Sequence, residues 1–258
     1  ETTTEELYEV LAGASAGGTS INQICETTDE SPHANTVRGY LTDQFDLDAV
    51  ESVGDTLLQR DTLETLPDRP VEVCIDLHLD PYYGDEEETE ALYSSKAKRG
   101  TTSFHAYATL YVRVRNKRYT LAVRQLTAGE TTGDVLAEFL ELLDGLDLGV
   151  KAVYLDRGFY NSTCLSLLSA YNYAYVMPII KWGKTIQDEL NSGWSREIEH
   201  ELAGKVTFPV FIDCVYQRGR YDEHGVARHG YAADAPFIDT PRDARHHYSK
   251  RFGIESSY

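Results

Sequence analysis

The sequence predicts an α/β fold in which a mixed sheet is flanked by helices. Three observations favour this class. Apolar and polar residues alternate in several runs from residue 71 onward, which indicates strands. The apolar spacing of residues 131–146 indicates an amphipathic helix, and short apolar runs then alternate with helical stretches. With 258 residues and a hydrophobic fraction of 41%, the chain is long enough for one large domain and a small one.

The N-terminal part is expected to form a small helical region. Residues 5–12 and 19–26 have helical spacing, and a third helix begins near Asn35 or Thr36. Short helices separated by a Gly/Ser break resemble a helix-turn-helix. Only Arg38 is basic in the candidate recognition helix, so a plain packing domain is an equal alternative.

A linker over residues 55–70 would separate this helical region, 1–70, from a second domain, 71–258. The second domain is expected to start with strands at 71–79, 103–115 and 118–127, the last two joined by a tight turn at Asn116-Lys117. The elements expected next are a helix capped by Thr131 or Thr132 (131–146), a strand (150–156), a helix (161–172), a strand (173–180), a β-rich insert (182–239) and a last helix that Thr240 caps and Pro241 starts.

The charge is strongly acidic but unevenly spread. The net charge is −18 and only 8 of the 24 basic residues are Lys, which indicates adaptation to molar salt. Residues 1–70 carry 15 acids and 3 bases, and the rest carry 27 and 21. The overall charge argues against a nucleic-acid partner.

One basic run favours a nucleic-acid partner in spite of the acidic overall charge. Residues 91–129 hold no acid and eight bases: Lys96, Lys98, Arg99, Arg113, Arg115, Lys117, Arg118 and Arg124. In so acidic a chain, this run predicts a polyanion-binding surface, although a solvated hairpin with chance clustering is the alternative. A period of two would place Arg113, Arg115 and Lys117 on one face of a strand.

Three carboxylates occupy positions typical of a catalytic site. Asp76 lies between Ile75 and Leu77 in the first strand, Asp156 ends a buried strand, and Glu255 lies on the last helix. A charge within an apolar strand is costly unless it is paired or bound to metal, and α/β sheets place their sites at the carboxyl ends of strands. Taken singly, each has a plain alternative: a solvated face for Asp76, a helix cap for Asp156, and the surface for Glu255.

The order of these elements and motifs resembles the DDE transposases encoded by bacterial and archaeal insertion sequences, of the type with a β-rich insert. "DLHLDPYYG" is similar to the family's first motif and "YLDRGF" to its second. The spacing of Tyr248, Arg251 and Glu255 is similar to the late signature Tyr-x2-Arg-x3-Glu-x6-Lys. The resemblance covers about residues 71–258, implies a ribonuclease H-like fold, and together with the acidic composition indicates a haloarchaeal member.

The resemblance also implies an activity and its residues. Asp76, Asp156 and Glu255 would hold two Mg²⁺ or Mn²⁺ ions for cleavage at the ends of a DNA element and strand transfer into target DNA. Tyr248 and Arg251 would contact DNA near the cleaved phosphate, where an Arg fork suits phosphate, although Arg251 could instead pair with Glu255 one helical turn away. Arg157 is a further phosphate candidate, with a surface role as the alternative.

The implied partner is double-stranded DNA, from both the element's terminal repeats and the target, bound by a dimer. No stretch reaches the roughly 20 apolar residues of a membrane helix. The four cysteines form no C-x-x-C pair, so we expect isolated buried thiols. The expected location is cytoplasmic and nucleoid-associated. The signature's Lys would fall at position 262, beyond Tyr258, which predicts a fragment or a truncated gene. The alternatives are a catalytically inactive DNA-binding remnant and a metal-dependent nuclease of the same fold.

Overall fold

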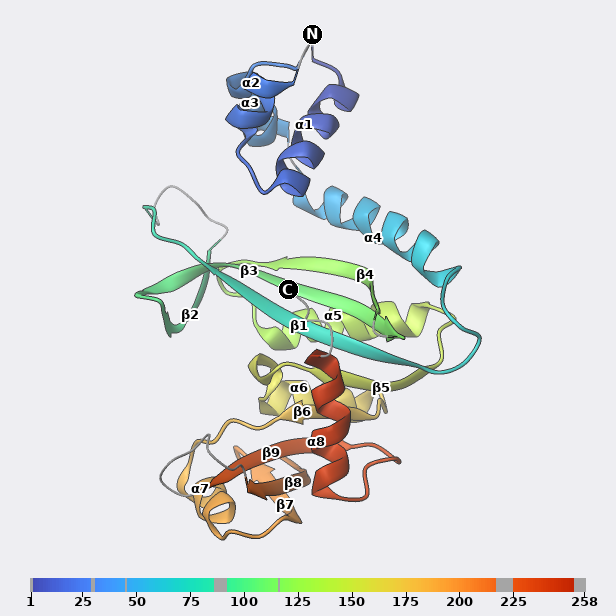
Figure 1. The fold of residues 1–258 in the computed structure, drawn as a ribbon, viewed down its shortest axis with the longest axis vertical. Coiled ribbons are helices and arrows are strands. Elements are labelled where there is room, and N and C mark those ends of the chain that lie inside the picture. Colours follow the sequence, from blue (N-terminus) through green and yellow to red (C-terminus); the bar gives the residue numbers. More distant parts are fainter. Residues whose placement is uncertain are drawn as a thin grey trace. The chain divides into compact units, whose positions relative to one another are not determined.

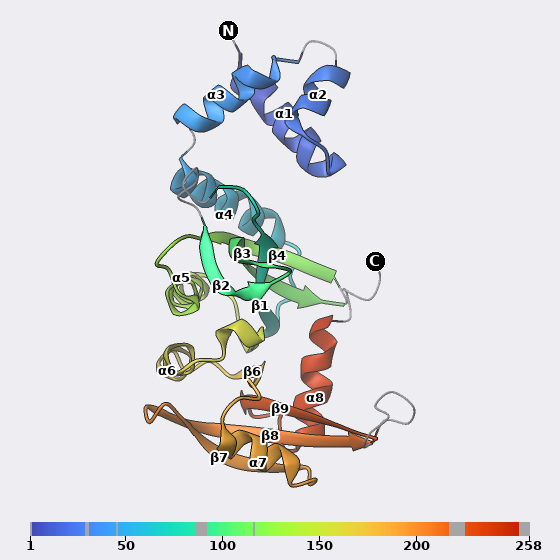
Figure 2. The same cartoon turned by 90° about the vertical axis from the view of Figure 1, so that its left-hand side faces the viewer.

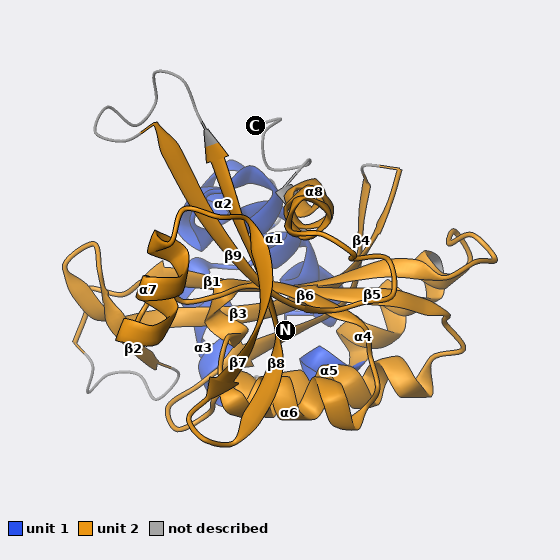
Figure 3. Ribbon diagram, turned by 90° about the horizontal axis from the view of Figure 1, so that it is seen from below, with its two compact units in different colours: residues 1–52 blue, residues 53–258 orange. Residues whose placement is uncertain are grey.

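The computed structural model describes residues 2–28, 31–44, 46–85, 92–115, 117–216 and 225–252. The chain divides into two compact units, Glu1–Ser52 and Val53–Tyr258 (Figure 3). The first unit contains α1 (Thr4–Gly17), α2 (Ile21–Thr27) and α3 (Ala34–Gln44). Thr3 caps α1 and forms a capping box with Glu6, so side chains satisfy backbone groups at that helix end.

The second unit is built on a mixed sheet. Its first strands are β1 (Val71–Pro81), β2 (Tyr93–Lys98), β3 (Thr101–Val114) and β4 (Lys117–Leu126). β3 pairs antiparallel with both β1 and β4, and β1 pairs in parallel with β5 (Val150–Leu155), which pairs in parallel with β6 (Tyr175–Pro178). The central order is therefore β4-β3-β1-β5-β6. This order and these directions define the predicted ribonuclease H-like sheet.

Helices cover both faces of the sheet, as Figure 2 shows. α5 (Thr132–Gly145) and α6 (Ser162–Ala170) pack against one face through a core that includes Val73, Ile75 and Phe139. The apolar spacing predicted for α5 is confirmed, because its whole inward stripe is buried. The opposite face of β1 contributes Cys74 to a second cluster with Tyr248.

The β-rich insert extends the sheet. It holds α7 (Lys184–Asn191), β7 (Arg196–Leu202), β8 (Val206–Tyr216) and β9 (Val226–Asp234), and β9 pairs antiparallel with β6 (Figure 1). The chain then enters α8 (Pro241–Ser249), which ends in the short 3₁₀ helix η3 (Lys250–Phe252). Thr240 caps α8 by accepting a hydrogen bond from the Asp243 amide at 3.2 Å, as predicted.

One expectation about the elements was wrong, and one strand was missed. Residues 47–63, which include most of the expected linker, form α4 (Leu47–Leu63), and Asp55 of this helix pairs with Arg124 at 2.6 Å. β2 was not predicted, because a short exposed strand of Ser, Lys and Ala lacks an apolar alternation. In the described residues no helix is both long and apolar enough to cross a membrane.

Candidate active site

The fold brings two of the predicted carboxylates together. β1 and β5 are parallel neighbours with Ile75 opposite Leu155, and the Asp156 amide donates to the Ile75 carbonyl at 3.2 Å. Asp76 and Asp156 each follow that pair by one residue. Asp76 is therefore level with Asp156, which follows the carboxyl end of β5. This edge lies beside the topological switch point of the sheet, where α/β folds place their sites.

Asp156 is placed at this edge without serving as a helix cap. It precedes the 3₁₀ turn η2 (Arg157–Phe159), but its side chain makes no capping hydrogen bond. Asn161 instead caps α6 by accepting from the Cys164 amide at 2.9 Å. The alternative that assigned Asp156 a capping role is wrong, which leaves its carboxylate available at the sheet edge.

Arg251 joins the two carboxylates from the end of the chain's last helix. Its Nη2 lies 2.5 Å from Oδ1 of Asp76, and its Nη1 lies 3.7 Å from Oδ1 of Asp156. The Arg251 side chain is 1% exposed, whereas those of Asp76 and Asp156 are 26% and 36% exposed. Asp76 is therefore a paired residue and does not lie on a simple solvated face.

Tyr248 holds this guanidinium from the preceding turn. Its hydroxyl oxygen lies 2.8 Å from Nη1 of Arg251, and its ring is buried. Burial raises the pKa of Tyr248, so the hydroxyl stays neutral. Burial alone would lower the pKa of Arg251, but the negative charges of Asp76 and Asp156 oppose that effect and the pKa is raised, so the cation is retained. Tyr248 and Arg251 thus act as one unit, facing the carboxylates.

The third predicted carboxylate, Glu255, lies outside the described residues. Within the described ranges no cluster of three or more His, Cys, Asp or Glu residues could hold a metal ion. The donor set at Asp76 and Asp156 still suits Mg²⁺, because it consists of partly exposed carboxylate oxygens with access for retained waters. A divalent ion here would share both carboxylates with the Arg251 guanidinium.

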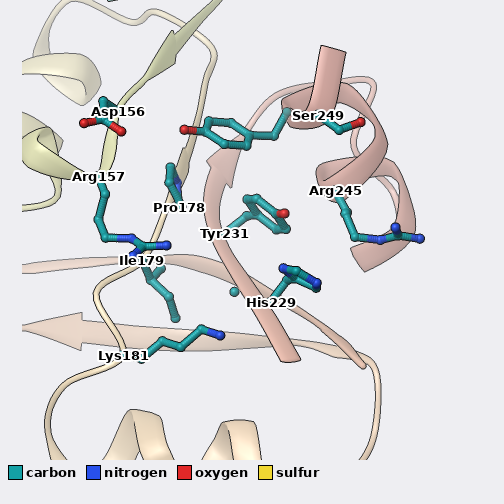
Figure 4. A pocket seen from close by; sticks show the side chains of 11 residues that line it. Asp156, Arg157, Pro178, Ile179, Lys181, His229, Tyr231, Arg245 and Ser249 are labelled. Carbon is teal, nitrogen blue, oxygen red and sulfur yellow. The ribbon is translucent and has the colours of Figure 1, made fainter. Parts of the chain in front are cut away.

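A pocket of about 630 Å³ opens next to Asp156 (Figure 4). Its walls come from the ends of β5 and β6, from β9 and from α8. The polar and charged side chains that line it, besides Asp156, are Arg157, Lys181, His229, Tyr231, Arg245, Tyr248 and Ser249. Arg157 is an exposed residue of η2, so the structure places this predicted phosphate candidate at the pocket.

The other cationic groups of the pocket were not found from the sequence. Desolvation lowers the pKa of Lys181, and the charges of Arg157 and Arg228 lower it further. Burial also lowers the pKa of His229, with Lys181 and Arg245 adding to the effect. Burial and neighbouring cations disfavour the charged forms of Lys181 and His229, so a bound anion would stabilise those charged forms. Lys181 follows the end of β6, and that position was the one sequence signal available.

The basic hairpin is arranged differently from the prediction. β3 ends at Val114, and Arg115 lies in the turn with a φ of 49°, so Arg113, Arg115 and Lys117 do not share one strand face. Arg113 forms an ion pair with Glu72 and has a side chain only 8% exposed.

Three of the other predicted DNA-binding bases of this run remain accessible. Lys96 and Lys98 are exposed on β2, and Lys117 is exposed at the start of β4.

Of the four cysteines, Cys74 and Cys164 are buried, Cys25 and Cys214 are half-buried, and all are free thiols, so the expectation of buried thiols holds for two.

Comparisons with known proteins give likeness at the level of structure alone. No family model and no curated protein matches the sequence. A piggyBac transposase synaptic complex with hairpin DNA is 12% identical over 99% of this chain and 54% of that one, with a TM-score of 0.48. An endonuclease V from Ciona intestinalis, in complex with DNA, is 12% identical over 73% of this chain and 82% of that one, with a TM-score of 0.31.

A Mos1 strand transfer complex is 11% identical over 68% of this chain and 59% of that one, with a TM-score of 0.25. The chain spans about half the length of the piggyBac transposase chain, at 54%. These neighbours are DNA transposases and a nuclease.

Proposed function

We propose that this chain is a DNA transposase that cleaves phosphodiester bonds at the ends of an element and transfers the freed ends into target DNA. One observation carries the proposal. Asp76 and Asp156 end up side by side on parallel strands, and Arg251 of the last helix meets both. These are the residues whose motifs resemble the DDE transposases, and the fold joins them although β1 and η3 are separated by most of the chain.

Each residue has a role that its position supports. Asp156 lines the pocket and Asp76 is level with it on the neighbouring strand, so both would supply carboxylate oxygens to an entering DNA phosphate. Glu255 is the proposed third ligand. Arg251, held by Tyr248, orients both aspartates. Arg157 and Lys181 would bind the phosphate chain within the pocket beside Asp156.

The proposed cofactor is a pair of Mg²⁺ or Mn²⁺ ions held by Asp76, Asp156 and Glu255. Such ions lower the pKa of a bound water and neutralise charge that develops on the phosphate. The protein's own contribution is to aim the carboxylates at the entering phosphate and to close one side of the site with the buried Tyr248 and Arg251 pair.

The proposed partners are the terminal repeats of the element and the target DNA, both double-stranded. Two ends must meet for strand transfer, so a dimer on DNA is part of the proposal. The acidic composition supports a halophilic host, and a cytoplasmic, nucleoid-associated location follows from the proposed substrate.

The test is cleavage and strand transfer on DNA that carries the element's own ends, with Mg²⁺ or Mn²⁺ in molar KCl. We expect metal-dependent products from the wild-type chain, and a loss of at least ~100-fold when Asp76 or Asp156 is changed to Asn. The matched control is Asp80→Asn, an exposed carboxylate on the same face of β1, which removes the same charge.

The outcomes separate the competing functions. Cleavage without joining would replace the transposase by a metal-dependent nuclease. DNA binding without metal-dependent cleavage would leave a DNA-binding remnant. Equal activity in Asp156→Asn and wild type would refute the catalytic role of this site.

A further inference from the structure

A second pocket, of about 430 Å³, is strongly basic and lies away from the catalytic pocket. It forms where the start of β1, the end of β3, the start of β5 and η3 meet. Its charged lining consists of five bases and one acid: Arg69, Arg113, Arg115, Lys151, Lys250 and Glu72. In a chain with a net charge of −18, such a concentration of bases requires an explanation.

The one acid of this pocket is already neutralised. Glu72 forms an ion pair with Arg113, accepts a hydrogen bond from the Tyr154 hydroxyl at 3.3 Å and lies 3.6 Å from Lys151. Burial would raise the pKa of Glu72, but Arg113 and Lys151 outweigh it and lower that pKa. Glu72 therefore organises the inner wall and leaves a surplus of positive charge.

Three of the bases are free to take a ligand. Arg69, Arg115 and Lys250 are exposed, and none forms an ion pair with a carboxylate in the part of the chain that the structure describes. They come from three separate segments: the residues before β1, the β3–β4 turn and η3. Arg115 is held in the turn with a positive φ of 49°, so its placement belongs to the fold of the hairpin.

The pocket and the carboxylate site lie along the same face of β1. Glu72, Cys74 and Asp76 alternate on the strand and share that face. Glu72 and Asp76 are four residues apart, which corresponds to roughly 13 Å along a strand. Lys250 lines the pocket, and its neighbour Arg251 contacts Asp76, so the same 3₁₀ turn reaches both places.

We propose that this basic pocket binds the phosphate backbone of double-stranded DNA, on the path of the same duplex whose phosphate enters between Asp76 and Asp156. This inference rests on the proposed function. A separation of roughly 13 Å corresponds to about four base pairs of rise along the axis of a duplex, at ~3.4 Å per base pair. Arg69, Arg115 and Lys250 are exposed and lie on three separate segments, which suits a polyanion that passes over a surface.

The test is the salt dependence of DNA binding in EDTA, where no cleavage is needed. A fluorescein-labelled duplex of about 20 base pairs is titrated with protein over a series of KCl concentrations. The triple variant Arg69→Gln, Arg115→Gln and Lys250→Gln should flatten the slope of log K against log[salt] by about 2 to 3, because each lost phosphate contact removes ~0.9. The control triple variant, Lys184→Gln, Lys205→Gln and Arg242→Gln, removes the same charge from exposed positions elsewhere and should keep the slope.

Cleavage kinetics then separate this inference from the proposed function. With an active wild type, the basic-pocket variant should show a raised KM and an unchanged kcat. An active wild type with equal slopes in both triple variants overturns the inference and leaves the function. A flattened slope specific to the basic-pocket variant, in a chain that never cleaves, supports the pocket and refutes the enzyme. A wild type that does not bind the duplex at all overturns the inference.

Discussion

Removal of the Arg251 cation should make the stability of this protein depend on divalent metal. In Arg251→Leu, the Asp76 and Asp156 carboxylates face each other with no positive charge between them. At an effective dielectric constant of about 20 an ion pair near 4 Å, such as that with Asp156 at 3.7 Å, is worth about 4 kcal/mol, the shorter pair with Asp76 is worth more, and burial of the guanidinium offsets part of both. Both carboxylates are partly exposed, so we expect a net loss of roughly 2 kcal/mol.

In a unit of this size such a loss lowers Tm by about 4–8 °C. Since the two carboxylates are then unpaired, a divalent ion gains more from binding them, and it stabilises the folded state by mass action. Differential scanning calorimetry with EDTA and with Mg²⁺ should show a larger metal-induced rise of Tm in Arg251→Leu than in wild type.

The matched control is Arg113→Leu, which breaks a comparably buried ion pair with Glu72. It should lower Tm without any extra response to Mg²⁺, because Glu72 is a single carboxylate that keeps Lys151 as a neighbour. Equal metal-induced shifts in Arg251→Leu and Arg113→Leu would refute the reasoning that Asp76 and Asp156 form one cation site.

Four further results are expected. Phe139→Ala in α5 should lower the free energy of unfolding by about 3–5 kcal/mol in chemical denaturation, because the ring is fully buried in the main core. Burial lowers the pKa values of His200, His229 and His247, so the unfolded chain binds more protons than the folded chain below about pH 6.5. Tm should therefore fall as the pH drops through that value. A Tm that does not change with pH in this range would contradict the expectation. Lys181→Gln should weaken DNA binding several-fold and make it less dependent on salt, as measured by fluorescence anisotropy. The Tm of the wild type should rise steeply from dilute buffer to molar KCl, and equal values would remove the case for salt adaptation.

The central strands of the sheet could be predicted because each of them carries its own local signal. The alternation in Val71–Leu79 and the apolar stripe of α5 are local patterns, and both pack as predicted. The cap at Thr240 was equally local. β2 and α4 were missed because neither has a strong periodicity, and α4 is placed by contacts with β4, such as that between Asp55 and Arg124.

The site was predictable only in part, because its contacts are long-range. Sequence spacing offered Arg251 two roles, a DNA contact or a pair with Glu255, whereas the fold places it against Asp76 and Asp156. Lys181 and His229 carry no motif and become candidates only when β9 lies beside β6. Arg113 was predicted as a DNA-binding base but is paired with Glu72, a long-range contact that strand periodicity could not reveal.

The most direct test of the central claim is Mn²⁺ binding to the folded chain, followed by electron paramagnetic resonance in molar KCl. Wild type and Asp80→Asn should bind Mn²⁺ alike, and Asp76→Asn and Asp156→Asn should each weaken binding by at least ~10-fold. If all four proteins bind Mn²⁺ equally, Asp76 and Asp156 do not form a metal site, and the proposed phosphodiester chemistry at this sheet edge is wrong.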